Sequence, residues 1–226
     1  MYEEQFSPPA SPRPFGEIPG LWTKVLQMTE QFFAQEAPRA SGSNTLISIL
    51  IMAVVSSVLA SISSLIWGGT QMAFLPPEYR EAMAVGAGSS VVCSLCSGLI
   101  GVAIGFYISN GLVYLGARIF GGTGDFTTQA YLASLFAVPV GIVSGLVGLV
   151  PCVGLIAVLA VSVYAVILNV RAVKVAHNLT TGQAVAAVLV PALVIGVLVA
   201  CLAVVGLVIL GPAIGDVFEN IVTNLE

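Results

Sequence analysis

Five long apolar segments constrain this chain more than any other feature of its sequence. Each approaches the ~20 residues that an α-helix needs to cross a hydrocarbon layer of about 30 Å. Only 8% of the 226 residues are charged, roughly a third of the share found in soluble domains, so a water-facing surface could not be built around a core. The segments lie at about 45–67, 89–109, 129–150, 152–171 and 184–210. They predict an all-α polytopic membrane protein, a bundle of five transmembrane helices.

Polar stretches flank this predicted membrane domain of residues 45–211. Residues 1–44 are rich in proline, and we expect a mostly unstructured arm with one amphipathic helix near 20–34 that contains Trp22. Two placements remain open for that helix: in the plane of the lipid headgroups, or packed under the bundle. Residues 212–226 predict a short amphipathic helix on the outer surface.

Basic residues predict the orientation. With a cytoplasmic N-terminus, six of the seven Lys and Arg residues fall on the inner side and Arg80 alone on the outer side, which obeys the positive-inside rule. We therefore expect 1–44 and 172–183 to be cytoplasmic, and 68–88 and 212–226 to be outside. The six inner residues are Arg13, Lys24, Arg39, Arg118, Arg171 and Lys174.

Small residues recur at every fourth position on one face of the second segment. Such faces let two helix backbones approach closely, which is how helices associate in lipid. We predict that this face packs against another helix, and a glycine-lined path for a substrate is the alternative. The residues are Ser97, Gly101, Gly105 and Ser109.

Groups that carry chemistry are scarce in the predicted segments. No Asp, Glu, Lys or His lies in the core of any of them, which argues against pumps and ion-coupled transporters. His177 is the only histidine and follows the fourth segment; without a motif that marks a nucleophile, helix capping and loop contacts are favoured over catalysis. We predict no enzyme activity, no cofactor and no metal site.

Four cysteines would lie toward the outer side of the bundle, where the topology allows them to converge. Free cysteine is a common small packing residue, and two cysteines one turn apart on a helix fit disulfide geometry poorly. We favour buried packing residues over a disulfide or a metal site. The four are Cys93, Cys96, Cys152 and Cys201.

The turns on the cytoplasmic side carry the most patterned sequence. Thr180 and Gln183 have the spacing of a capping box at the start of the fifth segment. Asp125 precedes the third segment, which it could cap, and as the only acid of these turns we expect it to pair with a nearby base. If the protein has a partner surface, we place it here. The candidate residues are Arg118, Asp125, Arg171, Lys174 and His177.

These turns also carry a resemblance to a known family. The matching residues are Gly121-Gly122-x-Gly124-x-Phe126, then Tyr131 and Pro139, the 169–177 stretch, and Leu179-Thr180-x-Gly182-Gln183-Ala184. Over about residues 20–210 the chain resembles the Yip domain family, the Ypt/Rab-GTPase-interacting integral membrane proteins. The resemblance implies five spans, a cytoplasmic N-terminus and an outward C-terminus. The Asp-Leu-Tyr-Gly-Pro signature of the eukaryotic trafficking members is missing, so the chain resembles a prokaryotic-type member in a cell membrane, for which GTPase binding is not implied.

Together these features predict a non-enzymatic membrane scaffold or adaptor, acting in membrane organisation or in partner recruitment. Its expected partners are the lipid bilayer and a membrane or cytoplasmic protein, and a homo-oligomer remains open. Nucleic acid is excluded as a partner, because 7 basic residues against 11 acidic ones leave no basic stripe. The alternative is a passive channel or transporter for a small uncharged solute.

Overall fold

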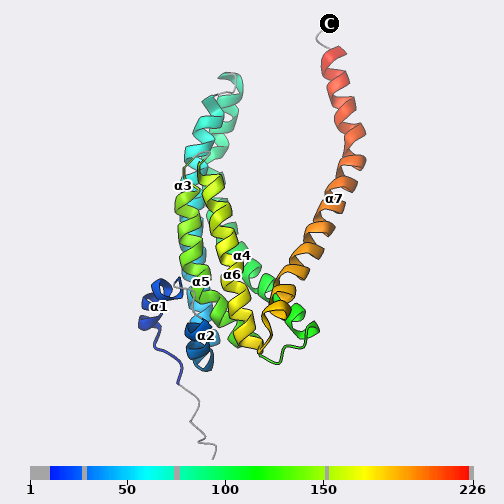
Figure 1. The fold of residues 1–226 in the computed structure, drawn as a ribbon. Coiled ribbons are helices and arrows are strands. Elements are labelled where there is room, and N and C mark those ends of the chain that lie inside the picture. Colours follow the sequence, from blue (N-terminus) through cyan, green and yellow to red (C-terminus); the bar gives the residue numbers. More distant parts are fainter. Residues whose placement is uncertain (1–10, 27–29, 74–76, 151–152, 224–226) are drawn as a thin grey trace, which may run out of the picture. The chain divides into compact units, whose positions relative to one another are not determined.

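Helices make up all the regular structure in the described part of the chain, residues 11–26, 30–73, 77–150 and 153–223 of a computed structural model. Side chains are described within these ranges except for 67–95, 153 and most of 213–223. Five of the helices are long and apolar enough to cross a membrane, which confirms the predicted all-α polytopic fold. Figure 1 shows the helices α1 (Ile18–Val25), α2 (Glu30–Glu36), α3 (Gly42–Ala73), α4 (Pro77–Ile119), α5 (Phe126–Val147), α6 (Val153–His177) and α7 (Thr181–Thr223), with short 3-10 turns at Phe15–Glu17 and Ala37–Arg39.

Two helices are longer than the sequence suggested. α4 runs without a break through Ser109, Asn110 and Gly111 to Ile119, past the end predicted for the second segment at about residue 109. α7 continues through Pro212 to Thr223, so the tail is part of this helix and not a separate one. An unpaired peptide group in hydrocarbon costs several kcal/mol, which outweighs the ~1 kcal/mol that a glycine costs inside a helix.

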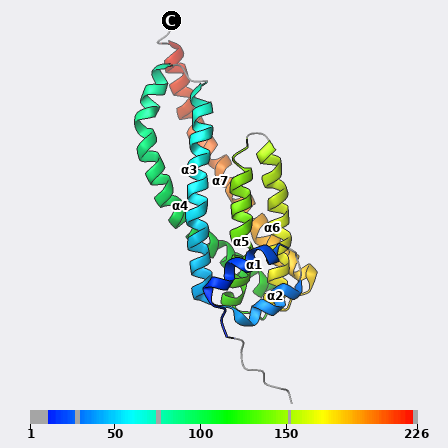
Figure 2. The same cartoon turned by 90° about the vertical axis from the view of Figure 1, so that its left-hand side faces the viewer.

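The chain forms two compact units, of which the first extends to Val188. Within it, α5 is the central helix and packs against α1, α3, α4 and α6. α5 is 22 residues long, which corresponds to about 33 Å. Connectivity brings the start of α3, the end of α4, the start of α5 and the end of α6 to one end, which we call the basal end; Figure 2 shows α1 and α2 lying across it. The second unit is the remainder of α7, whose described side chains are almost all exposed.

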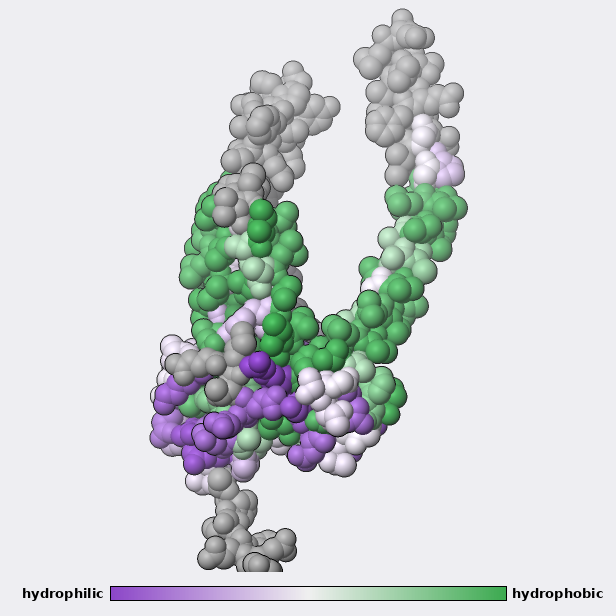
Figure 3. Space-filling view, in the orientation of Figure 1, coloured by the Kyte–Doolittle hydropathy of each residue, from purple (hydrophilic) through white to green (hydrophobic). Residues whose placement is uncertain are grey.

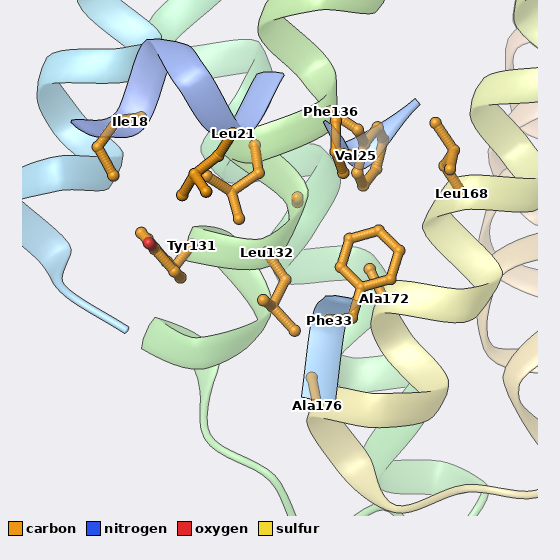
Figure 4. Packing of buried hydrophobic residues seen from close by; sticks show 12 residues of the cluster. Ile18, Leu21, Val25, Phe33, Tyr131, Leu132, Phe136, Leu168, Ala172 and Ala176 are labelled. Atoms are coloured by element: carbon orange, nitrogen blue, oxygen red, sulfur yellow. The ribbon is translucent and has the colours of Figure 1, made fainter. Parts of the chain in front are cut away.

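The described part of the arm is folded, which corrects the expectation of a mostly unstructured segment. α1 and α2 bury Ile18, Leu21 and Phe33 against α5 and α6, as Figure 4 shows. Two helices, α1 and α2, stand where we predicted one amphipathic helix near 20–34. Of the two placements left open for that helix, the structure has the one packed on the bundle. The prolines do not prevent helix formation here, because Pro19 and Pro38 stand in the first turns of their helices, where proline is tolerated.

The surface of the first unit divides into two zones. Figure 3 shows hydrophilic residues gathered at the basal end, around α1 and α2, and hydrophobic ones along α3 to α6 above it. Ion pairs of the described residues, such as Lys174–Glu30 and Arg13–Glu36, lie at the basal end. This is the pattern expected where helices leave the hydrocarbon layer.

The small-residue face of α4 does not pack within the first unit as we predicted. Ser97, Gly101, Gly105 and Ser109 are exposed, and a Cβ atom added to Gly101 or Gly105 would meet nothing within 4 Å. α4 instead approaches α3 through Gly98, where an added Cβ would lie 2.6 Å from Ser57 Oγ. Within the first unit, α4 therefore approaches α3 through Gly98 and not through the repeat at every fourth position.

A pair of glycine variants tests this assignment. We expect Gly98→Leu to lower the stability by about 1–3 kcal/mol, since the added side chain must separate α3 from α4, whereas Gly101→Leu adds apolar surface where the first unit leaves space. Thermal unfolding in detergent, followed by aggregation, measures the difference. A midpoint for Gly101→Leu as low as that for Gly98→Leu would contradict the assignment.

Two of the four cysteines have described side chains. Cys96 and Cys201 are free thiols and are exposed, which corrects the expectation that they are buried packing residues. The side chain of Cys93 and the whole of Cys152 lie outside the described part of the structure.

Candidate functional site

Two turns meet at the basal end of the first unit: residues 120–125 between α4 and α5, and residues 178–180 between α6 and α7. The Thr123 N–H donates to the His177 carbonyl oxygen at 3.2 Å, and the Gln183 Nε2–H donates to the Phe120 carbonyl oxygen at 3.1 Å. We call residues 118–127 and 178–183 together the loop surface.

The helices that precede the two turns, α4 and α6, end in the same way. Gly121 has φ 90° and Asn178 has φ 53°, the left-handed conformation that ends many helices. The Gly122 N–H then donates to the Ala117 carbonyl at 2.8 Å, and the Leu179 N–H donates to the Lys174 carbonyl at 3.1 Å. These two bonds satisfy carbonyl groups that the ends of α4 and α6 would otherwise leave unpaired.

Both turns also end in a capped helix start, as the sequence predicted. Asp125 is the N-cap of α5, and its carboxylate accepts from the Thr128 N–H at 2.8 Å and from the Thr128 hydroxyl at 2.7 Å. In the capping box the Thr180 N–H donates to Gln183 Oε1 at 3.0 Å, and the Gln183 N–H donates to Thr180 Oγ1 at 3.4 Å.

Variants of Asp125 separate its cap from its charge. We expect Asp125→Ala to lower the stability by about 0.5–2 kcal/mol, because the first turn of α5 loses its cap, and Asp125→Ser to recover most of this. Thermal unfolding in detergent provides the measurement. Equal losses for both variants would show that the charge contributes more than the cap.

The cap also predicts a pH dependence. Burial acts to raise the pKa of the Asp125 carboxyl, but hydrogen bonds from the Thr128 hydroxyl and from backbone N–H groups outweigh it and hold the pKa below its ordinary value of 3.8. The carboxylate thus contributes its stability above that value and loses it as the pH falls through the lower folded-state pKa. We expect the difference in melting temperature between wild type and Asp125→Ala to shrink as the pH falls below about 5.

Close backbone contact joins the loop to α6. A Cβ atom on Gly124 would overlap the Ala176 carbonyl oxygen and lie 2.6 Å from its carbonyl carbon. A Cβ atom on Gly122 would lie 2.9 Å from the Cβ atom of His177, the last residue of α6. We expected an Asp125 ion pair to hold these turns together, but the structure does this with backbone hydrogen bonds and glycine contacts.

His177 lies beneath the loop surface and is fully buried. Its Nε2 is 2.7 Å from Gln129 Oε1, and Gln129 Nε2–H donates to the Asn110 carbonyl at 2.9 Å. Because the Gln129 oxygen accepts, Nε2 of the imidazole carries a proton and donates it to this contact. His177 therefore supports the surface from below and is not exposed to a partner, which corrects its place among the candidate contact residues.

The other candidates divide between the loop surface and the arm. Arg118 is exposed, and its Nε–H donates to the Tyr114 hydroxyl at 2.9 Å. Asp125 is exposed beside it on the loop surface. Lys174 instead donates to Glu30 of α2 at 2.9 Å, and Arg171 is half-buried on α6. The candidates thus lie at one end of the bundle but on two separate surfaces.

The arm is fixed to the bundle by polar contacts that the sequence did not reveal. Glu36 of α2 is only 2% exposed; it accepts from Arg13 Nη2–H at 2.6 Å and from the Tyr131 hydroxyl at 3.3 Å. The Tyr164 hydroxyl donates to the Leu26 carbonyl at the end of α1. We call the Arg13–Glu36–Tyr131 contact the arm latch.

Neither Glu36 nor Gln129 was predicted as a site residue. Nothing in the sequence pairs Arg13 with an acid 23 positions later, since only the fold of the arm brings them together. Gln129 did carry a signal: it is a polar residue in the first turn of a predicted span, and such residues find a partner. Within the described residues, no group of three His, Cys, Asp or Glu side chains could hold a metal ion.

Comparison with known proteins gives one match. A family model described as the Yip1 domain matches residues 24–211, from within α1 to the membrane-spanning part of α7. No curated protein and no solved structure matches the chain.

Proposed function

The chain belongs to the Yip1 domain family of integral membrane proteins, and we propose that it is a non-enzymatic membrane adaptor that recruits a protein partner through the loop surface. Yip1 is not a known enzyme family. The adaptor would act in membrane organisation or in trafficking-like recruitment. The proposal goes beyond the family assignment because it names the surface that binds the partner.

The proposal rests on one observation: the backbone of the two exposed polar turns that form the loop surface is held in place by many local contacts. Two left-handed helix ends, two helix caps and two hydrogen bonds between the turns hold the loop surface. Ordering a loop upon binding costs about 1–2 kcal/mol for each residue fixed, so a preordered surface keeps more of its contact energy as affinity.

Charge supports a cytoplasmic location for this surface. Arg118, Arg171 and Lys174 belong to the basal end, and Arg80 is the only basic residue assigned to the opposite side. By the positive-inside rule we place the basal end and the N-terminus in the cytoplasm, and the end of α7 outside. In keeping with the resemblance to prokaryotic-type members, we propose a prokaryotic cell membrane.

Charge reversal on the loop surface tests the proposal. The full chain with Arg118→Glu and Asp125→Arg is purified from native membranes beside wild type, and bound proteins are quantified. We expect a saturable partner that is retained by wild type and lost by this variant. Gln35→Glu, at an exposed position of α2, serves as the control and should retain it. Binding that persists in the double variant would exclude the loop surface.

A further inference from the structure

The structure contains an apolar cleft at the junction of α1, α5 and α6. Its volume is about 340 Å³, more than twice the ~150 Å³ of an apolar cavity that holds benzene. We infer that it binds one acyl chain of a bilayer phospholipid. The lining residues are Leu26, Val140, Val143, Ala160, Val161 and Tyr164.

The location of the cleft determines which molecules can reach it. Val143 and Ala160 lie on α5 and α6, within stretches long and apolar enough to cross a membrane. Next to them on α6, Leu159 and Val163 are exposed by 60% and 63%, so the cleft is continuous with a lipid-facing surface. The solvent at its opening is therefore hydrocarbon, and an acyl chain enters without being transferred from water.

The chemistry of the lining agrees with this occupant. Among the described lining residues only Tyr164 has a polar side chain, and its hydroxyl already donates to the Leu26 carbonyl. A water molecule needs two to four polar partners to occupy a cavity, which these described residues do not offer. A methylene chain needs none.

The arm forms one wall of the cleft, and this distinguishes it from an ordinary groove between two helices. Leu26 is the C-cap residue of α1 and belongs to the arm, whereas the other described lining residues belong to α5 and α6. The complete cleft exists only while the arm is docked. Acyl-chain binding and arm docking must then stabilise each other, because the linkage between two such equilibria is reciprocal.

Photolabelling of the full chain in nanodiscs tests the inference, which depends on the membrane location and not on the proposed partner. The probe is a phosphatidylcholine with a diazirine within one acyl chain, and adducts are mapped by mass spectrometry. We expect adducts at Val140, Val143 and Val161 to exceed those at exposed Leu155 by about fivefold, since labelling follows occupancy. Equal labelling at all four positions would overturn the inference, since it would indicate ordinary surrounding lipid only.

Three variants, one of them a control, then test whether the labelling depends on the cleft and on the arm. Ala160→Phe fills the cleft and should reduce the labelling of Val143 to the level of Leu155, whereas Leu159→Phe, one residue away and outside the lining, should leave it unchanged. Tyr164→Phe removes the bond to Leu26 and should lower the same labelling. Unchanged labelling of Val143 in Ala160→Phe would overturn the inference, and the wild-type pattern tests it even if that variant does not fold.

Discussion

Replacing Gly124 by alanine is expected to disrupt the basal end more than any other single methyl group added to the described glycines. The new Cβ atom would overlap the Ala176 carbonyl oxygen and lie 3.0 Å from the His177 Cα. These are backbone atoms at the end of α6, so no side chain can rotate away to make room. We expect a loss of about 4 kcal/mol or more, which is exceptional for one methyl group.

Thermal unfolding of the full chain in detergent measures this loss, and Gly182→Ala is the matched control. Gly182 lies in the first turn of α7, and a Cβ atom there would meet nothing within 4 Å. Because alanine is the better helix former by about 1 kcal/mol, we expect the control to be neutral or slightly stabilised. If Gly124→Ala had the same midpoint as Gly182→Ala, the contact between the loop and α6 would not form.

The elements that were predicted correctly are those that local rules determine. The five spans follow from hydropathy, because hydrocarbon leaves the backbone no alternative to a helix. The Asp125 cap and the Thr180–Gln183 box were also predictable, since each connects residues only three positions apart. For such features the spacing of two residues in the sequence determines whether their side chains and backbone groups can meet.

The features that were not predicted depend on contacts between distant parts of the chain. The every-fourth-residue repeat on α4 finds Gly101 and Gly105, but only the position of α3 makes Gly98 the contact. His177 was predicted to lie in the turn after the fourth segment, but it is the last residue of α6, and its burial depends on Gln129, 48 positions earlier. A polar residue in a sequence does not reveal whether it faces water or a buried partner.

The arm shows the same limit at a larger scale. Its prolines and its low share of apolar residues suggested disorder, and the pattern around Trp22 left two placements open. The apolar positions Ile18, Leu21 and Val25 recur on one face of α1 and identify what that helix buries. The surface that they bury it against, on α5 and α6, is more than 100 residues away and cannot be obtained from local spacing.

The arm latch should be the strongest polar contact that holds the arm to the bundle. Glu36 is nearly fully buried, and Arg13 supplies three hydrogen bonds to its carboxylate. Arg13→Ala would leave that carboxylate buried, with a hydrogen bond from the Tyr131 hydroxyl. Removing one partner of a buried ion pair costs about 3–5 kcal/mol; because Arg13 itself is 23% exposed, we expect the lower end, about 3 kcal/mol, and an arm that undocks.

Electron–electron distance measurements between spin labels at the exposed positions Gln35 and Thr127 report the undocked fraction. The double variant Arg13→Ala with Glu36→Leu should dock better than Arg13→Ala alone, because it removes the unpaired charge and leaves an apolar side chain beside Phe33.

The Lys174–Glu30 pair is the matched control. Its side chains are 27% and 47% exposed, and exposed pairs contribute about 0–1 kcal/mol, so Glu30→Ala should leave the arm docked. If Glu30→Ala released the arm while Arg13→Ala did not, the exposed pair and not the buried one would hold it. The arm would then respond strongly to ionic strength, because salt screens an exposed pair far more than a buried one.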